Sequence, residues 1–197
     1  MSHLLHKRAV LTGVIALLAV LFAAAPSTAK AVYLSPAELE LLTSGETVRQ
    51  ELPSSRKGGF YGGTGWAIID APADEIWATL LDWKTYPKVW PSTVEMKELS
   101  RKGNKMLIRM KLGHPIVQVL YHIEMRRNDA KKTLSFKLVS GHPSDVDEIR
   151  GYWRLFPQGD GRTLVAYVVA FRVPMGIVNL VGAEFEREAV EGILNAP

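Results

Sequence analysis

The chain has 197 residues, a formal net charge of +4 and no cysteine. The lack of cysteine excludes a disulfide framework, a thiol nucleophile and a lipid anchor attached at a cysteine. Lys7, Arg8 and Lys30 lie in the first 31 residues, so the remaining 166 residues carry 21 basic and 20 acidic side chains. Such a balance does not favour binding to nucleic acid, which needs a basic surface, and 166 residues are enough for one domain with its own core.

Residues 1–31 have the three parts of an export signal. A basic segment at residues 6–8 precedes an apolar run at residues 10–25, and Ala29 and Ala31 supply small residues at the two positions that a signal peptidase recognises. The apolar run has 16 residues, so as a helix it would reach about 24 Å, less than the ~30 Å hydrocarbon core of a membrane. We therefore predict a cleaved Sec-type signal peptide and a periplasmic or secreted protein.

Residues 32–59 are predicted to form an N-terminal helix and a linker. Ser35 and Glu38 have the spacing of a capping box, and Pro36 suits the first turn of a helix. Gly45 suits the residue after the last turn. The sequence therefore predicts a short amphipathic helix whose role it does not define.

A glycine-rich segment separates the first two predicted strands. One strand is expected at residues 47–52 and the next at residues 66–69, with a polar loop at residues 54–63 between them. The loop lacks the pattern of a phosphate-binding loop, and it precedes a strand where a nucleotide loop would precede a helix. It therefore favours a flexible hairpin or a bulged strand.

An amphipathic helix is predicted at residues 73–83. Pro72 has a backbone angle that suits the first turn, and Asp74 and Glu75 lie where the helix dipole favours negative charge. The apolar residues that follow recur at helical spacing: Ile76, Trp77, Leu80, Leu81 and Trp83.

The chain then alternates strands and turns up to residue 173. Pairs of strands surround short polar turns, which is typical of β-hairpins: 93–99 with 106–112, 117–126 with 133–139, and 147–156 with 163–173. A final helix is predicted at residues 175–194, with an apolar stripe formed by Val178, Val181, Phe185, Ala189 and Ile193. This order of elements predicts an α+β fold with a strongly curved antiparallel sheet.

Four short motifs carry a resemblance to a known superfamily. They are Ala-Pro-Ala-Asp-Glu-Ile-Trp at 71–77, Tyr-Pro at 86–87, Gly-Tyr-Trp-Arg-Leu at 151–155 and Gly-Arg-Thr at 161–163. Together with the order of elements they resemble the START-like superfamily (SRPBCC), also called the polyketide cyclase/dehydrase and lipid transport superfamily. The resemblance implies a helix-grip domain over residues 60–197, in which the sheet wraps around a long C-terminal helix and leaves a cavity for an apolar ligand.

One face of the predicted meander is apolar and rich in aromatic residues and methionine, because alternate residues of a strand share a side. This composition suits an adaptable ligand site. Tyr121, Trp153 and Tyr167 are the strongest candidates, since each joins an apolar ring to a polar group that can orient a ligand. With the resemblance, the pattern predicts a ligand site made of Met110, Tyr121, Ile123, Phe136, Ile149, Trp153, Tyr167, Phe171, Val181 and Phe185.

The sequence predicts no catalytic residue, no metal site and no cofactor. The histidines after residue 31 are His114, His122 and His142, and none has a partner at metal-ligand spacing. His114 and His142 precede proline, which favours loops, and His122 falls on the more polar face of its strand. No Gly-x-Ser-x-Gly motif is present, which excludes the nucleophile elbow of a hydrolase.

Charged residues near the last hairpin are assigned to the surface. Asp145, Asp147 and Glu148 lack the pattern of a calcium loop and predict a solvated acidic loop. Arg172 stands in an otherwise apolar strand, where an unpaired buried charge would be costly. We expect it either to emerge at the end of the sheet or to pair with Glu148 or a ligand headgroup.

The resemblance implies a domain that binds a lipid or other hydrophobic small molecule without catalysing a reaction. An alternative on the same scaffold is an enzyme of the polyketide cyclase, aromatase or dehydratase type. That enzyme would need Tyr121, His122 or Tyr167 to donate or accept a proton inside the cavity, and the export signal argues against it.

A third hypothesis is a module that binds a protein partner. It would need an exposed apolar patch around Tyr86, Val89 and Trp90. Nucleic acid is not expected as a partner. Transient contact with a membrane is compatible with the exchange of a lipid.

Overall fold

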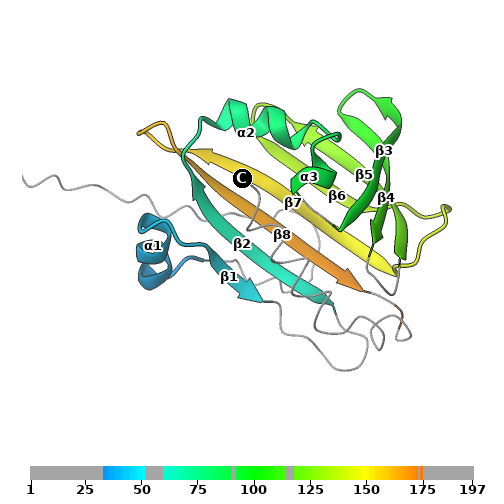
Figure 1. Ribbon diagram of the computed structural model, residues 1–197, viewed down its shortest axis with the longest axis horizontal. Coiled ribbons are helices and arrows are strands. Elements are labelled where there is room, and N and C mark those ends of the chain that lie inside the picture. The colour runs from blue at the N-terminus through cyan, green and yellow to red at the C-terminus, as the bar shows by residue number, and fades with distance from the viewer. Residues whose placement is uncertain (1–32, 52–59, 90–91, 114–117, 173, 175–197) are drawn as a thin grey trace, which may run out of the picture. The chain divides into compact units, whose positions relative to one another are not determined.

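The computed structural model describes residues 33–51, 60–89, 92–113, 118–172 and 174 (Figure 1). The chain divides into two compact units, Met1–Leu34 and Ser35–Pro197, and the architecture below is that of the second unit. The predicted signal segment and the predicted helix 175–194, with Val181 and Phe185, lie outside the described residues. The elements in chain order are α1 (Pro36–Thr43), β1 (Val48–Glu51), β2 (Tyr61–Ile69), α2 (Ala73–Leu80), α3 (Tyr86–Val89), β3 (Thr93–Lys102), β4 (Lys105–Gly113), β5 (Gln118–Asn128), β6 (Thr133–Leu138), β7 (Glu148–Pro157) and β8 (Thr163–Arg172).

The short helix α1 begins at a complete capping box. The Ser35 hydroxyl accepts a hydrogen bond from the Glu38 N–H at 3.3 Å, and the Glu38 carboxylate accepts one from the Ser35 N–H at 2.6 Å. At the other end Gly45 has a φ of 89° and donates its N–H to the Leu42 carbonyl at 3.2 Å. The predicted helix is therefore present. None of the described helices has the length and apolarity needed to cross a membrane.

The strands form one antiparallel sheet of eight strands in the order β1-β2-β8-β7-β6-β5-β4-β3. From β3 to β8 each strand pairs with its neighbour in the chain, so the predicted meander is confirmed. β2 pairs along its whole length with β8, from Tyr61 opposite Phe171 to Ile69 opposite Thr163. Figure 1 shows β2 and β8 side by side in a curved sheet, which confirms the predicted α+β fold class.

The prediction of a loop over residues 54–63 is wrong at its C-terminal end. β2 begins at Tyr61, and Gly62 and Gly63 lie in the ladder opposite Ala170 and Val169. Gly62 has a φ of 120°, and a Cβ atom there would lie 3.0 Å from the Val169 carbonyl carbon. Glycine therefore permits a close approach of two strands at this position. The sequence does not reveal the distant strand that requires it.

The predicted helix 73–83 ends three residues early, at Leu80. A turn follows in which an Asp82 carboxylate oxygen accepts a hydrogen bond from the Lys84 N–H at 3.1 Å. A local side-chain bond of this kind competes with helix continuation. Trp83 therefore lies outside the helix, but its side chain still packs against the core.

The helix α2 is tied to the turn between β5 and β6. Trp77 is buried, and its indole Nε1 donates to a carboxylate oxygen of Asp129 at 2.9 Å. This hydrogen bond is the main cause that lowers the pKa of Asp129. Lys132 places its Nζ atom 2.5 Å from an Asp74 oxygen and 5.8 Å from the centre of the Trp77 ring. One helix and one hairpin thus form a single packed unit.

Candidate ligand-binding face

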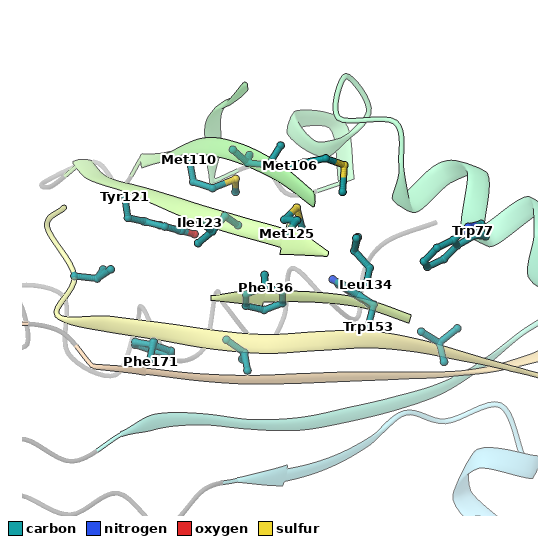
Figure 2. Close-up of a cluster of buried hydrophobic side chains, with 14 of the residues drawn as sticks. Trp77, Met106, Met110, Tyr121, Ile123, Met125, Leu134, Phe136, Trp153 and Phe171 are labelled. Atoms are coloured by element: carbon teal, nitrogen blue, oxygen red, sulfur yellow. The ribbon is translucent and has the colours of Figure 1, made fainter. Parts of the chain in front are cut away.

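The candidate site is one side of the curved sheet, which we call the apolar face. Met110 lies opposite Tyr121, and Trp153 lies opposite Tyr167, so these side chains share a face across neighbouring strands. Figure 2 shows Met110, Tyr121 and Ile123 on β4 and β5 turned toward the side on which Phe136 and Trp153 lie. The apolar face consists of Met106, Ile108, Met110, Val119, Tyr121, Ile123, Met125, Leu134, Phe136, Ile149, Trp153, Leu155, Val165, Tyr167, Val169 and Phe171.

The structure brings together every predicted site residue that it describes. These residues, all on the apolar face, are Met110, Tyr121, Ile123, Phe136, Ile149, Trp153, Tyr167 and Phe171. Val181 and Phe185 lie outside the described residues, as does the surface of the C-terminal segment that would face the sheet. The shared face of the eight is confirmed, and their contact with a ligand stays a prediction.

Aromatic rings group at the centre of the apolar face. The Tyr167 ring centre lies 4.2 Å from that of Trp153 and 6.2 Å from that of Phe136. Near the C-terminal end of β8, the Phe171 ring stacks on the ring of Tyr61 on β2, with the ring centres 5.9 Å apart. Rings in contact at these distances gain stability beyond their burial, and they give the face flat surfaces against which an apolar molecule can lie.

Gly151 makes room for one of these rings, and sequence reasoning did not identify it as part of the site. Residue 151 lies opposite Phe136 on β6 and opposite Val169 on β8. A Cβ atom at this position would come within 2.5 Å of the Phe136 ring. The Phe136 ring therefore occupies the space that a side chain would take. The available signal was a glycine inside an apolar strand pattern, which often marks a close approach.

The hydroxyls of Tyr121 and Tyr167 are polar groups within this apolar surface. Burial raises the pKa of Tyr121, and burial is also the main cause that raises the pKa of Tyr167, followed by the Tyr121 and Tyr86 phenols. Both phenols therefore stay protonated near neutral pH. In the described part of the chain, neither hydroxyl has a hydrogen-bond partner. Each is available to donate a hydrogen bond to a bound molecule.

Among the residues described, charged groups reach the apolar side of the sheet at two places. On the edge strand β1, Arg49 lies opposite Gly65 and Glu51 lies opposite Gly63, beside the apolar residues of β8. Toward α2, the charged groups are paired. Glu98 lies opposite Ile108 in the ladder, accepts a hydrogen bond from Trp83 Nε1 at 2.9 Å and lies 2.6 Å from Arg101. The hydrogen bond from Arg101 is the main cause that lowers the pKa of Glu98. Arg127, opposite Leu134, pairs with Asp129 at 3.0 Å. These carboxylates are ionised at neutral pH and are not proton donors.

His122 lies on the more polar face of β5, as the sequence predicts, but it is buried there. His122 is only 6% exposed, its Nδ1 lies 2.9 Å from the Pro143 carbonyl, and its ring stacks on that of His142 at 4.8 Å. The segment after β6 folds back along β5, where the Asp145 N–H donates to the Leu120 carbonyl at 2.7 Å. His122 is thus buried on the side of β5 opposite to Tyr121, which removes it from the candidate site.

Most of the acidic residues near β7 are accounted for by local pairing. An Asp145 carboxylate oxygen accepts a hydrogen bond from the Leu120 N–H at 2.8 Å. Glu148 lies 2.8 Å from Arg150 and 3.6 Å from Arg172, and Arg172 is 41% exposed at the end of β8. Both expectations for Arg172, emergence and pairing with Glu148, are therefore met. Over the described ranges, His, Asp and Glu side chains form no group of three that could hold a metal ion.

The predicted patch for a protein partner loses one of its members. Tyr86 is 4% exposed, and its hydroxyl donates to the Leu80 carbonyl at 3.0 Å. Its side chain is thus part of the packing between α2 and α3. Trp90 and the side chain of Val89 lie outside what the structure describes.

A curved antiparallel sheet with a long apolar face rich in aromatic residues places the protein in the class of START-like, helix-grip domains. The chain belongs to the family described as polyketide cyclase / dehydrase and lipid transport, and the match covers residues 64–196. No curated protein sequence is similar to it at a significant level. The family resemblance inferred from the sequence motifs is therefore confirmed.

Solved structures agree on the fold. A protein of Thermus thermophilus is 16% identical with a TM-score of 0.58, over 68% of this chain and 89% of that one. The Zhui aromatase/cyclase of Streptomyces sp. R1128 is 19% identical with a TM-score of 0.58, over 70% and 90%. A STAR-related lipid transfer protein of Xanthomonas axonopodis is 13% identical with a TM-score of 0.52, over 73% and 95%. At these identities the similarity is one of fold, and the fold serves both an enzyme and a lipid transfer protein.

Proposed function

We propose that this protein is an exported carrier that binds a lipid or other hydrophobic small molecule between the apolar face and its C-terminal segment, without catalysing a reaction. The family and the solved structures support binding of apolar molecules in general. That the protein catalyses no reaction and that it is exported are separate proposals, and each has its own test below.

The observation that carries this proposal is the partial exposure of Tyr167. The residue lies on β8, which is paired on both sides, and it points to the same side as the buried Val165 and Val169. A tyrosine at the centre of a fully packed core would be buried like its neighbours. Tyr167 is instead half-buried, so accessible space reaches the middle of the apolar face.

A row of small residues lies next to Tyr167 across the sheet. Gly63, Val169 and Gly151 are opposite one another on β2, β8 and β7. Two glycines beside one valine leave little side-chain volume on this row. The Phe136 ring lies at its Gly151 end, and the backbone of β1 lies close to its Gly63 end. The row is therefore where a bound molecule would add the most packing.

Native mass spectrometry of protein purified from its export compartment tests the proposal. We expect a bound molecule that organic extraction removes and that is recovered in the extract. Val169→Phe places a ring on the small row and should reduce the bound fraction severalfold. Val168→Phe adds the same volume on the opposite side of the same strand and should leave the bound fraction unchanged. Empty wild-type protein, or equal occupancy of the two variants, would contradict the proposal; thermal unfolding confirms that both variants fold.

The enzyme alternative rests on one specific observation, the two unpartnered hydroxyls of Tyr121 and Tyr167 on the described apolar face. Each could donate a proton or hold a carbonyl of a reactive chain in one conformation. A synthetic poly-β-ketone chain incubated with the protein would reveal this activity. We expect the same product distribution as without protein; a cyclised product that disappears in Tyr121→Phe or Tyr167→Phe would establish the enzyme instead.

Export is proposed from the sequence of residues 1–31. N-terminal sequencing of the protein produced from its full gene should find a chain that begins at Val32, after Ala31. Replacing Ala29 and Ala31 by leucine should block cleavage and leave the precursor attached to the membrane fraction. Recovery of uncleaved wild-type protein in the cytoplasm would overturn this part of the proposal.

A further inference from the structure

The side of the sheet opposite to the apolar face carries a large excess of positive charge. Alternate residues of a strand point to opposite sides, so the residues between the members of the apolar face belong to this second side. On β3 to β8 its positions hold ten of the 21 basic side chains of residues 32–197 but only three of the 20 acidic ones. We call its basic members the basic face: Lys97, Lys102, Lys105, Arg109, Lys111, Arg126, Lys137, Arg150, Arg154 and Arg172.

Four cross-strand pairs on the basic face join two cations. They are Lys97 with Arg109, Lys102 with Lys105, Lys105 with Arg126, and Lys137 with Arg150. Like charges directly opposite one another destabilise a sheet. An anionic surface laid against these strands would remove the repulsion, so the arrangement favours such a partner.

The acidic residues on this side do not neutralise it. Each of the three is paired with an arginine: Glu95 with Arg109 at 2.6 Å, Glu124 with Arg126 at 2.6 Å, and Glu148 with Arg150 at 2.8 Å. The lysines of the basic face form no ion pair with any residue that the structure describes, and all except Lys111 are exposed. Asp145 and Asp147 join the sheet at one end, where their N–H groups donate to the Leu120 and Arg172 carbonyls, and they reduce the excess only there.

Two exposed apolar side chains border the basic face. Val94 is 53% exposed and Leu99 is 40% exposed, and both belong to β3, the edge strand of the sheet. Each lies at a shift in the register between β3 and β4. Binding to a membrane surface gains from buried apolar area and from attraction to anionic lipids, whereas a soluble polyanion such as nucleic acid is held mainly by the cations. Apolar groups beside a cationic face therefore favour a membrane.

We propose that the basic face docks this protein on a membrane surface that contains anionic phospholipids, with Val94 and Leu99 entering the interface at its border. The inference goes beyond the carrier function and does not depend on the ligand, because docking uses the opposite side of the sheet from the apolar face. It assigns a partner to the like-charged pairs that the protein itself leaves without compensation.

Sedimentation of the mature protein with lipid vesicles tests the inference. We expect binding to vesicles of phosphatidylcholine and phosphatidylglycerol in equal parts, and none to vesicles of phosphatidylcholine alone. The bound fraction should fall as sodium chloride is added, because salt screens exposed charges. Equal binding to the two kinds of vesicle would overturn the proposal.

Two triple variants locate the binding surface at the same net charge. Lys97→Gln with Lys105→Gln and Lys137→Gln should weaken binding to the anionic vesicles about 100-fold, since each basic side chain near such a surface contributes about 1 kcal/mol. The control replaces three exposed lysines away from the basic face by glutamine: Lys84, Lys88 and Lys131. It should bind like the wild type. Equal weakening of the two variants would show a general effect of net charge and would refute docking through this face.

The first triple variant also interrupts all four like-charged pairs. Its thermal unfolding midpoint at low salt should therefore not fall below that of the wild type. A lower midpoint would mean that the lysines stabilise the sheet, and it would remove the reason for an anionic partner.

A double variant distinguishes a membrane from a soluble polyanion. Val94→Ser with Leu99→Ser keeps the charge and should reduce binding to the anionic vesicles severalfold, because less apolar area enters the interface. Unchanged binding would contradict the role of these two side chains. If the wild type bound double-stranded DNA through the basic face but not the vesicles, the face would be assigned to nucleic acid and the proposal would fall.

Discussion

Replacement of Gly151 by alanine would test the close packing at the centre of the apolar face. The added methyl group would come within 2.5 Å of the Phe136 ring and would also press against the backbone carbonyl of Val168 on β8. The ring can rotate away, but the carbonyl belongs to the ladder between β7 and β8 and cannot move without weakening it. The substitution is therefore an overpacking change with one flexible and one rigid neighbour.

Overpacking of a well-packed core typically costs about 1–3 kcal/mol, and a rigid backbone neighbour places this site at the upper end, about 3 kcal/mol. For a domain of this size each kcal/mol lowers the unfolding midpoint by roughly 2–4 °C, so we expect a decrease of about 6–12 °C. Gly159→Ala is the matched control, because nothing lies within 4 Å of the added methyl group in that turn. It should be neutral or stabilise the protein by up to about 1 kcal/mol.

Urea unfolding followed by tryptophan fluorescence measures both variants, with Trp153 next to the altered site. Phe136→Leu in the Gly151→Ala background should restore only part of the lost stability, because the Val168 carbonyl remains. Full recovery would assign the whole clash to the Phe136 ring. Equal stability of Gly151→Ala and Gly159→Ala would refute the reasoning about this site.

Other substitutions test the sheet and its N-terminal helix. Leu134→Ala removes a side chain with 0% exposure and should lower the free energy of unfolding by about 3–5 kcal/mol; a loss below about 1 kcal/mol in the same urea assay would show that the site is loosely packed. Thr163→Val removes a buried hydroxyl that donates to the Ala71 carbonyl at 2.8 Å, and should cost about 1–3 kcal/mol by leaving that carbonyl without its donor. Ser35→Ala removes the N-cap of α1 and should cost about 1 kcal/mol, whereas Ser35→Asp should keep most of the stability. The pKa of Glu38 is lowered, chiefly by the hydrogen bond from the Ser35 backbone, so its contribution to stability is present above the ordinary pKa of a glutamate and is lost as the pH falls through the lowered value. Glu38→Gln should remove that part of the acid dependence in thermal unfolding between about pH 5 and pH 2, and an unchanged acid profile would argue against the bond.

Local patterns in the sequence predicted most of the elements and the members of the apolar face. Side chains alternate along a strand, so Tyr121, Trp153 and Tyr167 could be placed on one side of their strands without knowledge of the partners. The capping box at Ser35 and Glu38 likewise acts within one turn. Both features depend on residues close in the chain, and the structure agrees with both.

Errors arose where a residue's environment is made by a distant segment. Gly62 and Gly63 have the composition of a loop, but pairing with β8, about a hundred residues later, makes them part of a strand. His122 lies on the polar face of its strand as predicted, and only its burial under the segment 139–147 was beyond the sequence pattern. Sequence patterns report propensity and periodicity, and neither contains the position of a remote partner.

The sequence by itself determined that the apolar residues of this meander share one face, and its motifs indicated the family. Only the tertiary structure decided that Gly151 admits the Phe136 ring, that the segment with Pro143 covers His122, and that the Tyr167 ring lies between those of Trp153 and Phe136. The physical reason is that a strand's alternation is set by its own backbone. The meeting of side chains across the sheet depends instead on the curvature and register that all eight strands produce together.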